Sequence, residues 1–137
     1  MSSFASPDSG LSPLVDGVSV SEDWTAGIGG GVWTTALIIA NYFDRRSGYL
    51  QRTLKGGRCL EVGSGNGWLS CVLAAVVPSC TVVATDTKEH VPLMRGTVEK
   101  NEEGGGRLEE GRGRVTAEEL LWGEQELGGT FDFIFGE

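Results

Sequence analysis

The feature that most constrains the fold of this chain is a strand that runs into a glycine-rich turn and then into a helix. The sequence predicts the strand at residues 58–62, the turn at 63–67 and the helix from about 68 to 77, where Pro78 stops it. Glycine lets such a turn be tight and lets a ligand approach the backbone closely. A strand that passes through a turn into a helix favours an α/β architecture.

The rest of the chain continues this alternation of strands and helices. Further strands are predicted at 80–85, weakly at 114–116, and at 131–135, and further helices at 34–46 and 89–101. This order implies a largely parallel sheet with right-handed crossovers. Such sheets bind ligands beyond the carboxyl ends of their strands, where the glycine turn and Asp86 are both expected to lie.

The chain has 137 residues, which is enough for one domain. Residues 1–26 are rich in serine and poor in aliphatic side chains, so we expect a disordered or loosely docked N-terminal segment there. The composition changes at Gly27, and residues 27–137 are expected to form the domain. His90 is expected to be a solvated side chain without a catalytic role.

The charge of the chain disfavours some classes of partner. Its 19 acidic and 11 basic residues give a net charge of −8, which argues against nucleic-acid binding by bulk charge and against adsorption to an anionic membrane. The longest apolar run, residues 71–77, is far shorter than the ~20 residues that span a bilayer. Three cysteines without a CxxC pair and a single histidine predict no disulfide framework and no metal site. We therefore expect a reducing compartment, the cytoplasm, with the nucleus as a second location.

The spacing of the glycines leaves two interpretations of the turn. A dinucleotide fingerprint, GxGxxG, needs a glycine at position 68, where this chain has Trp68. The spacing is instead GxGxG, and Glu61 precedes it by two residues. A carboxylate at the strand tip would repel a pyrophosphate but could receive an ammonium group, so S-adenosylmethionine fits better than NAD. Asp86, about 20 residues further on, could accept hydrogen bonds from both ribose hydroxyls. The alternative is a glycine turn without a ligand.

Several short motifs then follow one another in a specific order. They are Gly31-Val32-Trp33, the loop 61–67, Thr85-Asp86, Leu120-Leu121-Trp122-Gly123 and the segment 131–137. In this order they resemble methyltransferase family 16, the small seven-β-strand protein lysine methyltransferases outside the SET class. The loop alone marks only the methyltransferase superfamily, and the two tryptophan motifs sharpen the resemblance, which covers about residues 27–137. It implies a Rossmann-like methyltransferase sheet, S-adenosyl-L-methionine as cofactor, and a protein substrate with an acceptor lysine.

The resemblance also implies a set of cofactor-binding residues, which are Trp33, Glu61, Gly63, Ser64, Gly65, Gly67, Asp86, Trp122 and Gly136. The backbone of residues 63–65 would line the methionine end of the cofactor, with Glu61 near its amino group and Asp86 at the ribose. Trp33 would pack against the cofactor, and Trp122 would flank the adenine. The alternatives are that Trp33 is a core residue, that Trp122 anchors a loop and that Glu61 caps the following helix.

The last residues correspond to the reacting end of the site. Gly136 would pass beneath the transferred methyl group, unless it is an ordinary strand-end glycine. Glu137 would begin the family's D/E-x-x-Y element, which makes it the predicted catalytic residue. The tyrosine of that element and the last three strands of the family's sheet would follow Glu137. We therefore expect a domain truncated after its fourth strand, with the C-terminal strands missing.

Three functions remain open at this point. The first is methyl transfer from S-adenosylmethionine to a protein lysine, with methyltransferases of RNA or small molecules sharing the same loop. The second is a non-catalytic cofactor-binding or interaction module, because a truncated chain would be inactive. The third is a nicotinamide oxidoreductase, which Trp68 disfavours.

Overall fold

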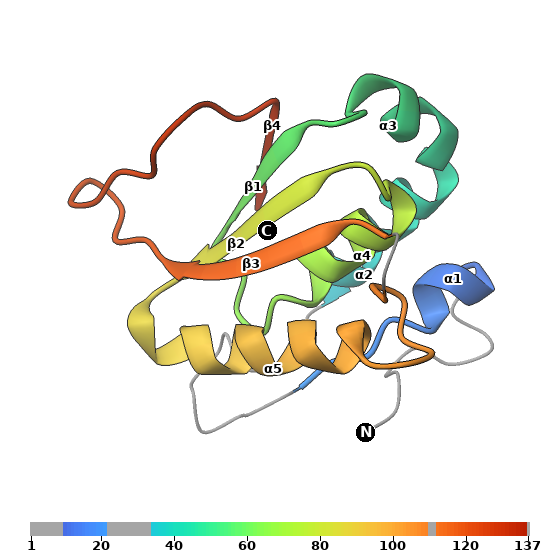
Figure 1. Ribbon diagram of the computed structural model, residues 1–137, viewed down its shortest axis with the longest axis horizontal. Helices are drawn as coiled ribbons and strands as arrows, with labels where there is room; N and C mark the ends of the chain where they lie inside the picture. Colours follow the sequence, from blue (N-terminus) through green and yellow to red (C-terminus); the bar gives the residue numbers. More distant parts are fainter. Residues whose placement is uncertain (1–9, 22–33, 110–111, 137) are drawn as a thin grey trace.

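The computed structural model describes residues 10–21, 34–109 and 112–136. It contains a four-stranded sheet in the order β3-β2-β1-β4, and every pair of neighbouring strands is parallel (Figure 1). The strands are β1 (Arg58–Val62), β2 (Thr81–Asp86), β3 (Arg114–Glu119) and β4 (Phe133–Gly136). The predicted α/β class and Rossmann-like sheet are confirmed.

The helices fill the connections between the strands. In chain order they are α1 (Pro13–Asp16), α2 (Thr34–Arg45), α3 (Ser47–Thr53), α4 (Trp68–Val76), the short 3-10 helix η3 (Lys88–His90) and α5 (Val91–Glu102). Helix α4 connects β1 to β2, and η3 with α5 connects β2 to β3. These two crossovers bring the ends of the three parallel strands to the same edge of the sheet.

One face of the sheet carries the core. Register places Glu61 of β1 beside Phe135 of β4. The Glu61 carboxylate contacts Ser70 of α4, and the Phe135 ring contacts Phe43 of α2 at 5.4 Å between centroids. Side chains at paired positions of a parallel sheet share a face, so α2 and α4 cover the same one. All nine residues of α4 are buried, as expected for a helix that is apolar on every side.

The N-terminal segment differs from its expectation where it is described. Within residues 10–21, Val15, Val18 and Val20 are buried in the core, and the indole Nε1 of Trp68 donates to the carbonyl oxygen of Val18 at 3.2 Å. Residues 10–21 thus pack against the core, where the sequence predicted a disordered or loosely docked segment. Composition misled here because a few valines suffice to dock a segment when each reaches the core. Residues 1–9 and 22–26 lie outside the described residues.

Some element boundaries also differ from the predictions. The helix predicted at 34–46 ends at Arg45, and a second helix, α3, follows it directly. Only Leu50 of α3 is buried, so it lacks the apolar period that would have revealed it. The last strand begins at Phe133 rather than residue 131, and just before it the Asp132 Oδ2 atom accepts a hydrogen bond from the backbone N–H of Arg58 at 2.9 Å.

Two predicted absences can be compared with the described part of the chain. Among the described residues, no helix is long and apolar enough to cross a membrane. The same residues include no cluster of histidine, cysteine and carboxylate side chains that could hold a metal ion. All three cysteines are free and buried.

Candidate functional site

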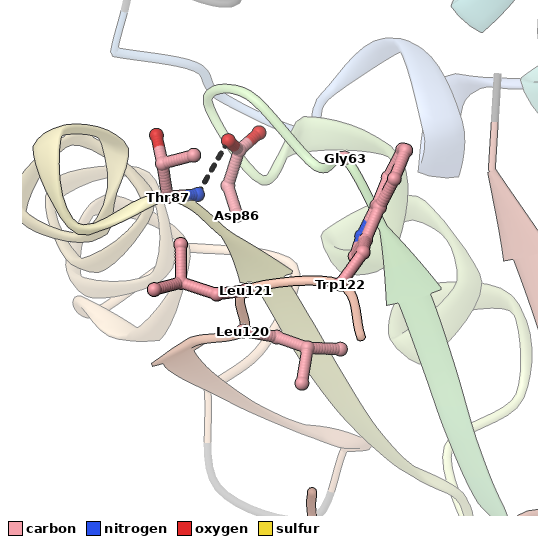
Figure 2. Close-up of a pocket in the computed structure, with 6 residues that line it drawn as sticks. All are labelled: Gly63, Asp86, Thr87, Leu120, Leu121 and Trp122. Carbon is pink, nitrogen blue, oxygen red and sulfur yellow. Dashed lines mark hydrogen bonds between the residues drawn. The ribbon is translucent and has the colours of Figure 1, made fainter. Parts of the chain in front are cut away.

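A cavity of about 340 Å³ opens at the carboxyl ends of the strands. The end of β1 contributes Gly63, the end of β2 contributes Asp86 and Thr87, and the segment after β3 contributes Leu120, Leu121 and Trp122 (Figure 2). The lining is mostly apolar and carries one carboxylate. A cofactor pocket commonly has this composition, in which apolar walls hold the ligand and a few polar groups orient it.

The glycine turn between β1 and α4 is shaped by backbone conformation. Gly63, Gly65 and Gly67 have φ angles of +65°, +62° and +79°, in the left-handed region that side chains other than glycine rarely adopt. A Cβ atom on Gly67 would lie 3.3 Å from Cβ of Met94 in α5. Gly67 is therefore required by helix packing, whereas Gly63 lines the cavity itself.

Ser64 joins the turn to β2. Its backbone N–H donates to the carbonyl oxygen of Thr85 at 2.8 Å, and its hydroxyl oxygen accepts from the N–H of Thr85 at 3.1 Å. The Thr85 hydroxyl donates to the carbonyl oxygen of Glu61 at 2.7 Å. These bonds hold the ends of β1 and β2 together, so the turn has a fixed position without a ligand.

Asp86 is the carboxylate of the cavity, and it accepts hydrogen bonds on both oxygens. Oδ2 accepts from the backbone N–H of Gly65 at 2.8 Å, and Oδ1 accepts from the backbone N–H of Thr87 at 2.6 Å, the bond drawn in Figure 2. The Nδ1 atom of His90 lies 3.3 Å from Oδ1, and both side chains are 14% exposed. Sequence reasoning placed Asp86 opposite the turn correctly. It missed His90, which was expected to be solvated.

Glu61 lies inside the protein rather than on the cavity wall. Its side chain is completely buried, and its Oε1 atom accepts a hydrogen bond from the Ser70 hydroxyl at 2.6 Å. Burial first, and then the charge of the Glu61 carboxylate, raise the pKa of the neighbouring Cys71 thiol. The Glu61 carboxyl group thus lies behind the glycine turn, and its bond to the first turn of α4 matches part of the alternative that it serves that helix.

The segment after β3 forms the outer wall of the cavity. The backbone N–H of Leu120 donates to the carbonyl oxygen of Asp86 at 3.0 Å, which carries the chain across the end of β2. Trp122 is 72% exposed, and its Cζ2 atom would lie 3.9 Å from a Cβ on Gly63. Such exposure contradicts the alternative that Trp122 is an anchor under a loop. Sequence reasoning quoted Leu120 and Leu121 within a motif but did not assign them to the site.

The three other predicted site residues are Gly136, Trp33 and Glu137. Gly136 pairs with Val62, and a Cβ there would lie 2.9 Å from the Val62 carbonyl oxygen. Glycine at 136 is therefore explained by strand packing, and a role beneath a methyl group stays a prediction. Trp33 and Glu137 lie outside the described residues.

One further polar residue of the turn escaped the sequence analysis. Asn66 is 3% exposed, and its Oδ1 atom accepts from the backbone N–H of Trp68 at 2.9 Å. This bond satisfies one of the free N–H groups at the start of α4. The alternating-glycine pattern treats position 66 as variable, which is why the pattern gave no signal for it.

Comparison with known proteins bears on what such a site does. The family model described as lysine methyltransferase matches residues 15–135. The protein N-lysine methyltransferase METTL21A of Danio rerio is 28% identical over 124 residues, which cover 87% of this chain and 51% of that protein. The chain thus spans about half the length of this relative. Because the family model matches nearly the whole chain, including both sides of the cavity, the chain belongs to the lysine methyltransferase family.

Proposed function

We propose that this chain binds S-adenosyl-L-methionine in the cavity at the strand ends and serves the transfer of its methyl group to a lysine of a protein. The observation that supports this proposal most directly is that Asp86 and the glycine turn meet at one cavity, where the backbone N–H of Gly65 donates to Asp86. The chain also belongs to the lysine methyltransferase family. The printed name of the zebrafish relative, a protein N-lysine methyltransferase, supports the acceptor class.

The lining residues fit a nucleoside. Asp86 is a partly exposed carboxylate at the end of β2, and such a group suits the hydroxyls of a ribose. Leu120, Leu121 and the Trp122 ring offer an apolar wall to the base. The Glu61 carboxyl group behind the turn, in its ionised form, favours a cationic group there over a pyrophosphate. A dinucleotide would meet this negative charge where its phosphates need N–H donors, which disfavours a nicotinamide cofactor.

The chemistry asked of the protein is mainly positioning. The bound cofactor supplies an electrophilic methyl group on a sulfonium, so no metal and no covalent enzyme intermediate are required. The acceptor lysine must be neutral and in line with that methyl, and removing its amine from water lowers its pKa and favours the neutral form. We further propose that Glu137 begins the acceptor side, and that the protein works in the cytoplasm, with the nucleus as a second location.

A second candidate is a cofactor-binding or interaction module without catalysis. It is favoured by the edge of the sheet, because in the described residues β4 pairs only with β1 and leaves Ile134 58% exposed. A site for an acceptor lysine needs a second wall, and the described residues supply only the cofactor side.

Methyl transfer separates these candidates. The chain would be incubated with radiolabelled S-adenosylmethionine and a panel of cellular proteins, and hydrolysed products would be analysed for N-methyl-lysine. The proposal expects labelled lysine that disappears in Asp86→Asn, whereas Asp132→Asn, a carboxylate at the opposite end of the sheet, retains it. Cofactor binding without labelled lysine would favour the second candidate, and label on RNA or on a small molecule would contradict the lysine assignment.

A further inference from the structure

The hydrogen bonds of Asp86 limit what its carboxylate can still accept. Its two oxygens already accept from the backbone N–H groups of Gly65 and Thr87, and the Nδ1 atom of His90 lies 3.3 Å from Oδ1 as an ion-pair contact. An ionised carboxylate offers about four lone-pair positions. A ribose presents two hydroxyl donors, so both hydroxyls and the two backbone N–H groups fill that capacity and leave no position for His90 at Oδ1.

His90 is the donor with an alternative partner. We assign the Nδ1–H form to His90, because the neighbouring Asp86 carboxylate accepts hydrogen bonds and donates none. The same Nδ1 atom is already hydrogen-bonded to the Thr87 hydroxyl at 3.1 Å, so His90 keeps a partner when it leaves Asp86. Among the described residues, the other ring nitrogen, Nε2, is buried and has no hydrogen-bond partner. The ring is thus held at Nδ1 alone, between two acceptors.

The backbone N–H groups of Gly65 and Thr87 are less free than the His90 side chain to move away from Asp86. The N–H of Gly65 belongs to a turn fixed by Ser64 and Thr85, and its bond to Asp86 is 2.8 Å long. The N–H of Thr87 belongs to the residue next to Asp86, and its bond is 2.6 Å long. The contact of His90 is the longest of the three, at 3.3 Å, and rotation of a side chain suffices to break it.

We propose that His90 competes with the cofactor ribose for Asp86, and that it gives up its contact with Oδ1 and keeps its hydrogen bond to the Thr87 hydroxyl when the ribose binds. This inference rests on the proposed role of Asp86 in holding the ribose. His90 would then set the affinity of the site for the nucleoside by stabilising the empty state. It is a residue that acts through Asp86 and does not contact the reacting atoms.

Two substitutions test the direction of this effect. In the intact chain, His90→Leu removes the competing donor, and adenosine should bind about fivefold more tightly, the equivalent of one ordinary hydrogen bond. His90→Asn keeps an N–H donor near the position of Nδ1 and should stay within about twofold of the parent. Adenosine and 2′,3′-dideoxyadenosine would be compared by calorimetry, and only adenosine should gain, because only its hydroxyls compete for Asp86.

The unmodified chain gives an independent measurement. His90 is its single histidine, so the imidazole nitrogen signals in a nuclear magnetic resonance spectrum belong to one residue. They should shift when adenosine is added and stay unchanged with 2′,3′-dideoxyadenosine at equal occupancy. Weaker adenosine binding by His90→Leu, or an equal gain for both nucleosides, would overturn the inference while leaving the cofactor site intact. A parent chain that binds neither adenosine nor S-adenosylhomocysteine would refute the proposed function itself.

Discussion

The glycine turn after β1 and the edge strand β4 differ in how completely other described residues bond to them or cover them. At the carboxyl ends of β1 and β2, Ser64, Thr85 and Asp86 hold the glycine turn through bonds within the protein. On the other side of β1, β4 has one described neighbour, and Ile134 is 58% exposed. The difference teaches that hydrogen bonds between β1, β2 and the turn organise the cofactor side, whereas the described residues leave an apolar side chain of β4 uncovered.

The largest expected effect comes from the glycine turn. Gly65→Val should abolish binding of S-adenosylhomocysteine, because a branched side chain at a φ of +62° forces the turn open and draws the N–H of Gly65 from Asp86. Gly56→Val is the matched control, since Gly56 has a φ of +66° and open space around it. Both variants carry the same backbone strain. Calorimetry should find binding lost in the first and kept in the second, and retained binding in Gly65→Val would mean that the turn is not the cofactor loop.

The next effect tests the carboxylate. Asp86→Ala should weaken S-adenosylhomocysteine binding by about 1.5–3 kcal/mol, the range for hydrogen bonds to a charged group. Asp132→Ala serves as control because Asp132 also accepts a backbone N–H, at the far end of the same sheet. Unchanged affinity in a folded Asp86→Ala chain would remove Asp86 from nucleoside recognition.

A smaller effect is expected at the cavity wall. Trp122→Ala should weaken cofactor binding by about 0.5–1.5 kcal/mol through loss of an aromatic contact with the base. The free energy of unfolding should hardly change, because the Trp122 side chain is 72% exposed. Trp122→Phe should recover part of the affinity. Thermal unfolding monitored beside calorimetry checks both quantities, and a large loss of stability would restore the interpretation of Trp122 as a structural anchor.

The smallest effect on stability concerns the β4 side. Ile134→Lys places a charge on an exposed strand edge and should reduce self-association while changing the free energy of unfolding by less than about 0.5 kcal/mol. Ile38→Lys, on α2 at a position that is 65% exposed, adds the same charge away from that edge. Light scattering over a concentration series should distinguish them. Equal behaviour of the two variants would show that the β4 edge does not cause association.

The sequence predicted the elements that carry strong local signals. It missed those whose structure depends on contacts with distant residues. The positions of β1, the glycine turn and β2 followed from glycine spacing and runs of β-branched residues. The docking of Val15 and Val18 did not, because their burial is decided by distant partners such as Trp68. Helix α3 was missed for lack of an apolar period.

In the site, the alternating glycines and the strand-end Asp86 were visible as a pattern. The contact of His90 with Asp86 was not, because a single histidine carries no periodic signal and its i, i+4 spacing becomes meaningful only once η3 is known to turn back towards β2. Leu120 and Leu121 belong to the cavity for a similar reason, since only the pairing of β3 with β2 brings them across Asp86.

The central claim is that the cavity binds S-adenosylmethionine rather than a dinucleotide. The most direct test is to titrate the unmodified chain with S-adenosylhomocysteine and, separately, with NAD, and to measure binding by calorimetry. The cavity at the strand ends, with Asp86 beside the glycine turn and the buried Glu61 carboxyl group behind it, should bind S-adenosylhomocysteine at one site and leave NAD unbound at the same concentrations. Tighter binding of NAD, or no binding of either ligand by a folded chain, would contradict it.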